Sequence, residues 1–96
     1  MLLQGKTILL SGASKGIGEC MAEKFAQNGA EKLLLLSRNL EKLRLLKEKI
    51  ENQSDTKVEV FQVDIRNRNE IKDAISQIKQ AKNKIDILVN NAGIMI

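Results

Sequence analysis

Four short runs of aliphatic and β-branched residues alternate with three longer segments in which apolar residues recur every three or four positions. The runs occupy residues 7–10, 33–36, 58–63 and 85–89. Continuous apolar runs are typical of parallel strands that are covered on both faces. The longer segments have the spacing of amphipathic helices, which predicts right-handed crossovers between the strands. The pattern predicts an α/β fold of order βαβαβαβ in a single domain, residues 1–96.

Each predicted helix has one apolar face. The faces consist of Ile17, Met21 and Phe25 in the first helix, Leu40, Leu43, Leu46 and Ile50 in the second, and Ile71, Ile75 and Ile78 in the third. The single cysteine, Cys20, lies on the first helix. We expect Cys20 to be packed rather than reactive, because free cysteine is among the most buried residue types.

The composition lacks most side chains that transfer protons. The 96 residues include no His and no Tyr, and only one Cys. Without His, the chain cannot form a Ser-His or Cys-His pair or an imidazole metal ligand, and without Tyr it has no phenol for acid–base catalysis. One thiol cannot make an internal disulfide or a cysteine-cluster zinc site. We therefore expect neither catalytic residues nor a metal site in this chain.

The charge and the apolar content limit the classes of partner. The net charge of +4 fits either a solvated lysine-rich surface or an anionic ligand. Two Phe residues are the only aromatics, so a base-stacking platform for nucleic acid is not expected. The longest aliphatic run, residues 33–36, is too short to span a bilayer, and no signal peptide is evident. A single Cys fits a reducing compartment, and we expect a cytoplasmic protein without a membrane or nucleic-acid partner.

The segment SGASKGIG joins the first predicted strand to the first predicted helix. Gly12 permits a tight turn there, and Gly16 and Gly18 allow the backbone to approach a ligand and the helix to pack on the strand. Unpaired N–H groups at the helix N-terminus attract phosphate. No Gly-Lys-Ser/Thr sequence closes the segment, so it is not a nucleoside-triphosphate P-loop. The segment predicts a phosphate-binding turn.

The second predicted strand ends at Ser37, Arg38 and Asn39. In dinucleotide-binding folds, an acidic residue about 20 positions after the glycine turn holds the adenosine ribose. Here Arg38 stands close to that position and no acid does. A guanidinium can bind a ribose 2′-phosphate through two hydrogen bonds, and Lys15 could supply a second positive charge. The alternative is that Arg38 is a solvated surface residue.

Polar residues also follow the third and fourth predicted strands. Asp64, followed by Ile65, could accept a hydrogen bond from an adenine amino group, or could instead start a turn or cap the next helix. The sequence Asn-Asn-Ala-Gly at residues 90–93 combines side chains that bridge backbone groups with small residues that leave room for a ribose. All four motifs fall at the carboxyl ends of strands, where ligands bind in open α/β sheets.

Together these motifs resemble the short-chain dehydrogenase/reductase family over residues 6–93, corresponding to its N-terminal, cofactor-binding portion. The resemblance implies an NAD(P)-binding Rossmann-like fold, with a partial doubly wound parallel sheet in strand order 3-2-1-4. It implies NADP(H) as the cofactor, with NAD less favoured. The implied cofactor-binding residues are Gly12, Ser14, Lys15, Gly16, Ile17, Gly18, Ser37, Arg38, Asn39, Asp64, Ile65, Asn90, Ala92 and Gly93.

The chain departs from the family where catalysis would begin. Family members carry a catalytic Ser, a Tyr-x-x-x-Lys motif and a further Asn beyond the Asn-Asn-Ala-Gly segment, whereas this chain has no Tyr and stops at Ile96. We therefore expect the NADP(H)-binding part of an oxidoreductase that transfers hydride between nicotinamide and a carbonyl or alcohol. The chain alone is expected to be inactive, and to associate with itself or with a missing C-terminal half. The alternatives are a non-catalytic, self-associating half-fold and a self-sufficient dinucleotide-binding module.

Overall fold

A parallel sheet forms the centre of the molecule, with strand order β3-β2-β1-β4, which confirms the predicted order. The computed structural model describes residues 2–13, 16–81 and 83–91. Its elements are β1 (Thr7–Ser11), α1 (Gly16–Gln27), β2 (Lys32–Ser37), α2 (Leu40–Gln53), β3 (Lys57–Gln62), α3 (Arg68–Gln80) and β4 (Ile87–Asn90).

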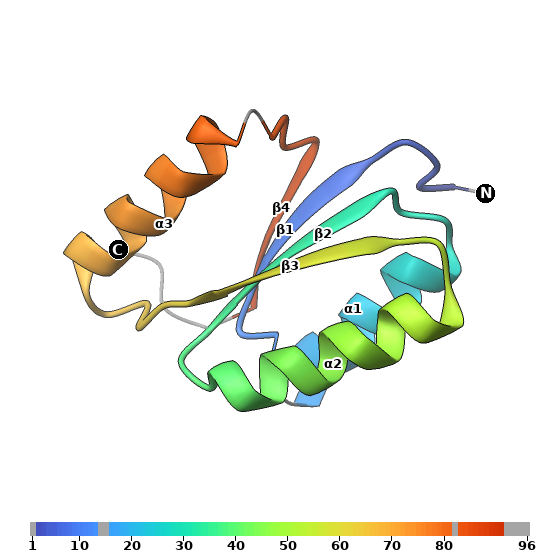
Figure 1. Cartoon of the computed structure of the whole chain (residues 1–96), viewed down its shortest axis with the longest axis horizontal. Helices are drawn as coiled ribbons and strands as arrows, with labels where there is room; N and C mark the ends of the chain where they lie inside the picture. The colour runs from blue at the N-terminus through green and yellow to red at the C-terminus, as the bar shows by residue number, and fades with distance from the viewer. Residues whose placement is uncertain (1, 14–15, 82, 92–96) are drawn as a thin grey trace.

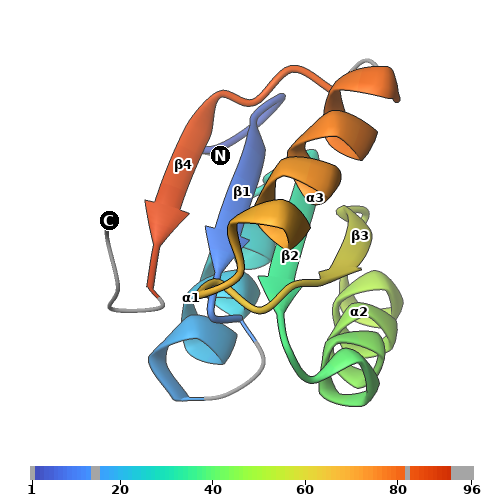
Figure 2. The same ribbon diagram turned by 90° about the vertical axis from the view of Figure 1, so that its left-hand side faces the viewer.

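Helices cover the sheet on both faces. Helices α1 and α2 lie against one face and α3 lies against the other (Figures 1 and 2). On the central strand β2, Leu33 and Leu35 belong to the core under α1 and α2, whereas Leu34 and Leu36 belong to the core under α3. All four leucines are buried. The apolar run is continuous because successive side chains point to opposite, equally buried faces.

Helix α1 packs through a face that only partly matches the prediction, since Met21 and Phe25 pack against the core but Ile17 does not. Ile17 is 72% exposed, while Gly18, Ala22 and Ala26 are buried against the sheet. Small side chains at these three positions let the helix approach the strands closely, and larger neighbours flank the contact. The prediction that Cys20 is packed is also wrong, because Cys20 is exposed. Two positions beyond Gly18 is about 200° around a helix, which turns the thiol away from the sheet.

The other two helices follow the predicted spacing more closely. In α2, Leu43, Leu46 and Ile50 are buried as predicted. In α3, Ile78 is buried, but Ala74 takes the central buried position and Ile75 is exposed. None of the helices in the described parts of the chain has both the length and the apolar content needed to cross a bilayer.

The fourth strand begins two residues later than predicted, at Ile87 rather than at residue 85. The preceding residue, Asp86, is fixed to β1 because its Oδ2 accepts a hydrogen bond from the Thr7 backbone N at 2.8 Å. Leu88, in the middle of β4, is 69% exposed although its neighbour across the sheet, Leu9, is buried under α3. The α3 core therefore stops before β4.

The opposite edge of the sheet, strand β3, carries a side-chain cap on its backbone. Lys57 N donates to the Glu31 carbonyl at the entry to β2, but the next backbone N, that of Val58, donates to Glu51 Oε2 at 3.0 Å. Glu51 comes from α2. A helix side chain thereby pairs a backbone N–H that the sheet leaves unpaired.

Candidate functional site

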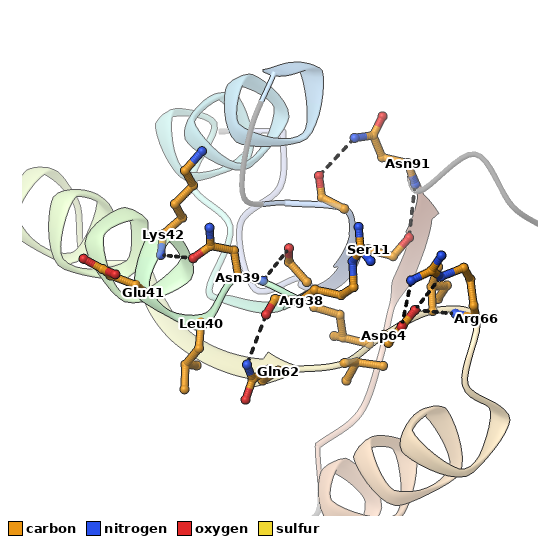
Figure 3. A pocket seen from close by; sticks show the side chains of 15 residues that line it. Ser11, Arg38, Asn39, Leu40, Glu41, Lys42, Gln62, Asp64, Arg66 and Asn91 are labelled. Carbon is orange, nitrogen blue, oxygen red and sulfur yellow. Dashed lines mark hydrogen bonds and ion pairs between the residues drawn. The ribbon is translucent and has the colours of Figure 1, made fainter.

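A cavity of about 940 Å³ opens at the carboxyl ends of the strands. Residues that follow or end all four strands line it (Figure 3). Six of the residues predicted for the site are among them: Gly12, Ser37, Arg38, Asn39, Asp64 and Ile65. The structure therefore brings the motifs after β1, β2 and β3 together around one volume.

The remaining predicted residues do not line this cavity or are not described. Ser14, Lys15, Ala92 and Gly93 lie outside the described residues. Gly16, Ile17, Gly18 and Asn90 are described but lie beside the cavity rather than in its lining. Their places at the start of α1 and the end of β4 keep them next to the same edge of the sheet.

Glycine is needed around the turn after β1 for two reasons, backbone conformation at Gly12 and Gly16 and close packing at Gly18. Gly12 and Gly16 have φ values of +69° and +60°, in the left-handed region that side chains disfavour. Gly18 serves packing instead, since a Cβ there would lie 2.0 Å from the Gly12 carbonyl oxygen and 2.7 Å from Asn91 Nδ2. The first turn of α1 therefore rests directly on the backbone of the loop that it follows.

Asn91 links the end of β4 to the same turn. Its Nδ2 donates to the Gly12 carbonyl oxygen at 3.2 Å, and its backbone N donates to Ser11 Oγ at 3.2 Å. Ser11 Oγ in turn donates to Asn90 Oδ1 at 2.9 Å. Both Ser11 and Asn91 line the cavity. Neither residue is among those predicted for the site, although Ser11 stands within the glycine motif and Asn91 within the Asn-Asn-Ala-Gly motif.

At the end of β2, Arg38 is exposed and lines the cavity beside the N-terminus of α2. Asn39, the next residue, caps that helix, because its Oδ1 accepts a hydrogen bond from Lys42 N at 3.0 Å. The Arg38 carbonyl oxygen accepts from Gln62 Nε2 at 3.1 Å, which fixes this loop to the end of β3. The Arg38 guanidinium thus extends from a backbone segment that is fixed by the cap of α2 and by Gln62 at the end of β3.

At the end of β3, the Asp64 carboxylate pairs with Arg66. Its Oδ1 accepts from the Arg66 backbone N at 3.0 Å and from Nε at 3.1 Å, and its Oδ2 accepts from Nη2 at 3.2 Å. The hydrogen bonds from the Arg66 guanidinium, followed by the one from its backbone N, hold the pKa of Asp64 below its ordinary value. The carboxylate in the cavity is therefore ionised at neutral pH.

The sequence left two structural roles open for Asp64: the prediction that it starts a turn is confirmed, and the prediction that it caps α3 is wrong. Asn67, not Asp64, caps α3, accepting from the backbone N of Asn69 and Glu70. Asp64 does start a turn, since its carbonyl oxygen accepts from Asn67 N at 2.8 Å. The turn leaves the Asp64 side chain in the cavity lining.

Arg66 and Gln62 line the cavity as well, although neither is among the residues predicted for the site. Gln62 lies at the end of β3, and Arg66 stands two residues after Asp64. The two-residue spacing between this carboxylate and this guanidinium is the sequence feature from which the Asp64–Arg66 ion pair could have been predicted.

Comparison with known proteins agrees with this arrangement. The family model described as short chain dehydrogenase matches residues 6–96. The chain belongs to the short chain dehydrogenase family. The resemblance expected from the four motifs is confirmed, and with it the Rossmann-like fold.

Several members of the short chain dehydrogenase family share about a third of their residues with this chain over the aligned part. The 3beta-hydroxysteroid dehydrogenase 2 of Eggerthella lenta is 35% identical over 94 residues, which are 98% of this chain and 35% of that protein. The oxidoreductase UcpA of Salmonella typhimurium is 40% identical over 93 residues, 96% of this chain and 34% of UcpA. The NADP-dependent 3-hydroxy acid dehydrogenase YdfG of Salmonella typhi is 36% identical over 89 residues, 93% of this chain and 34% of YdfG.

Solved structures of the short chain dehydrogenase family superpose on the chain. The L-sorbose reductase of Gluconobacter frateurii, complexed with NADPH and L-sorbose, gives a TM-score of 0.87 at 29% identity, covering 96% of this chain and 35% of the reductase. A metagenomic short-chain oxidoreductase in complex with NADP gives 0.82 at 30% identity, covering 98% of this chain and 42% of that one. The chain spans about a third of the length of the curated relatives described above.

Proposed function

We propose that this chain binds NADP(H) in the cavity at the carboxyl ends of its strands, as the cofactor-binding part of an oxidoreductase that acts on a carbonyl or alcohol. The observation that carries the proposal is the position of Arg38. It lines the cavity at the end of β2, and no acidic residue stands where dinucleotide folds hold the ribose of NAD. NADP-dependent YdfG and the NADPH-bound L-sorbose reductase support the same cofactor.

The side chains in the cavity fit such a cofactor. The space that a Cβ at Gly18 would fill is already taken by the Gly12 carbonyl, so the N-terminus of α1 packs directly on the glycine turn, and helix N-termini attract phosphate. Arg38 supplies a cation for a 2′-phosphate, and Asp64 supplies an acceptor for a base. We keep Ser14, Lys15, Gly16, Ile17, Asn90, Ala92 and Gly93 as further predicted contacts on the phosphate and ribose side.

The cofactor would supply the hydride, and the residues of this chain would bind and orient it. Arg38 and Asp64 both line the cavity, and we assign Arg38 to the 2′-phosphate and Asp64 to the base. None of the described residues is assigned a proton-transfer role.

Two further expectations belong to this proposal. The exposed Leu88 and the open edge of β4 favour association with a second copy or with further chain that completes the fold. We also propose a cytoplasmic location, with which a single cysteine that cannot form an internal disulfide is consistent.

Titration calorimetry with NADPH and NADH tests the proposed function. We expect the chain to prefer NADPH, and Arg38→Ala to lower that preference about ten- to a hundredfold, because a charge-assisted hydrogen bond contributes roughly 1.5–3 kcal/mol. Arg44→Ala is the matched control, since Arg44 is an exposed arginine of α2 outside the cavity lining. Failure of a folded chain to bind either nucleotide would overturn the proposal. An unchanged preference in Arg38→Ala would remove Arg38 from the site.

A further inference from the structure

We propose that Arg66 is a positioning residue: it holds the Asp64 carboxylate so that one acceptor position remains for the exocyclic amino group of adenine, and this ion pair sets the base specificity of the cavity. This inference rests on the proposed function, because it assigns a base to the same cavity. Arg66 lies at the wall of that cavity, next to Asp64 (Figure 3).

Counting hydrogen bonds on the carboxylate leads to this inference. An ionised carboxylate offers about four acceptor positions, two on each oxygen. Oδ1 accepts from the backbone N and from Nε of Arg66, so both of its positions are used. Oδ2 accepts from Arg66 Nη2, which leaves it a second position. Within the described parts of the chain, no other group donates to this carboxylate.

The carboxylate is also fixed in orientation. Arg66 grips it from both its backbone and its side chain, so rotation of the Asp64 side chain would break three hydrogen bonds. The Asp64 backbone is anchored separately, since its N donates to Glu70 Oε1 at 3.0 Å and its carbonyl oxygen accepts from Asn67 N. The remaining acceptor on Oδ2 is therefore presented from a rigid frame.

A rigid acceptor discriminates between bases. The amino group of adenine can donate to Oδ2, whereas the carbonyl oxygen that replaces it in hypoxanthine would face a carboxylate oxygen with no proton between them. An unpaired carboxylate could turn toward solvent and avoid the mismatch. Loss of Arg66 should thus weaken the binding of adenine more than that of hypoxanthine.

Exposure makes Arg66 suitable for substitution. The Arg66 side chain is 62% exposed, and that of Asp64 is 28% exposed, so the arginine is the more exposed partner of the pair. Removing it creates no core cavity. Arg68, two residues further on, is an exposed arginine at the start of α3 that does not line the cavity, and it provides a matched control.

The test compares NADPH with reduced nicotinamide hypoxanthine dinucleotide phosphate by titration calorimetry on the whole chain. We expect the wild type to prefer NADPH, and Arg66→Ala to lose about tenfold in NADPH affinity because it must then order the carboxylate on binding. Affinity for the hypoxanthine nucleotide should change less than about twofold. Arg68→Ala should match the wild type with both ligands.

Two further variants separate positioning from charge. Arg66→Lys keeps the charge but lacks the planar guanidinium. It should therefore recover less than half of the increase in log Kd for NADPH that Arg66→Ala causes. In an Asp64→Ala background, Arg66→Ala should have no further effect, because Arg66 acts through that carboxylate. Circular dichroism checks that each variant is folded.

Other outcomes overturn the inference. Equal losses for both nucleotides in Arg66→Ala, full recovery by lysine, or an additive effect in the Asp64→Ala background would each show that Arg66 acts through its charge or by another route. If the wild type binds NADPH and Arg66→Ala binds it equally well, this inference fails while the proposed function stands. If the folded wild type binds neither nucleotide, the proposed function itself fails.

Discussion

Gly18 is a position at which the structure leaves no room for a side chain. A Cβ there would overlap the Gly12 backbone at 2.0 Å and crowd Asn91 Nδ2. We expect Gly18→Ala to lower the free energy of unfolding by about 3 kcal/mol, at the upper end of the usual cost of overpacking, because backbone must move. Urea denaturation measures the loss.

Gly5→Ala is the control for Gly18→Ala. Gly5 has φ +78°, and a Cβ there meets no atom within 4 Å, so only backbone strain opposes the substitution. We expect a loss of about 1 kcal/mol. Equal losses in the two variants would show that the contact between Gly18 and Gly12 relaxes easily.

Single residues also show how far the sequence could predict the site. Arg38 and Asp64 line one cavity, as the sequence predicts, because each follows an apolar run and parallel strands bring such positions to one edge. Asn91 was not found, because its role is to bond the Gly12 carbonyl, and nothing in the order of residues shows that these two meet. Arg66 was overlooked because a surface arginine near an aspartate is common, and only the orientation of its fork distinguishes it.

Helices α2 and α3 are both preceded by an Arg-Asn pair. Comparing the two helices therefore separates the effect of helix capping from the effect of cofactor binding. Arg38-Asn39 precedes α2 and Arg66-Asn67 precedes α3, and each Asn caps its helix. We expect Asn39→Ala and Asn67→Ala each to cost about 1 kcal/mol of unfolding free energy. Only Asn39 lines the cavity, so only Asn39→Ala should also lower NADPH affinity, about two- to tenfold.

Urea denaturation and calorimetry on the two asparagine variants measure these effects. A loss of NADPH affinity in both, or in neither, would contradict a binding role for Asn39 beyond its cap.

At the level of elements, the periodicity predicted the helices correctly but only part of the packing face of α1. Met21 and Phe25 pack against the core as predicted, but Ile17 is exposed and the buried residues of the helix are Gly18, Ala22 and Ala26. Close approach of a helix to a sheet favours small side chains, and a hydrophobic pattern gives them little weight. In α2 the contact residues are Leu and Ile, so pattern and packing agree.

At the scale of the whole molecule, the sheet is covered unevenly on the side of α3. Leu34 on β2 is fully buried there, whereas Leu88 on β4 is 69% exposed. We expect Leu34→Ala to lower the free energy of unfolding by about 2–5 kcal/mol. Leu88→Ala should change it by less than about 0.5 kcal/mol, the usual range for surface substitutions.

Urea denaturation of dilute protein, with the slope of the transition compared between variants, tests the two leucine predictions. A large loss in Leu88→Ala would mean that another surface covers β4 in solution.

The hydrogen bond between the Val58 backbone N and Glu51 bears on association between molecules. An outer strand is where a foreign strand would add to a sheet and begin aggregation. At the start of β3 the first backbone N–H that faces away from β2 is already held by a carboxylate from α2. An incoming strand would have to displace that carboxylate and meet its charge. One glutamate thus hinders strand addition at the start of β3.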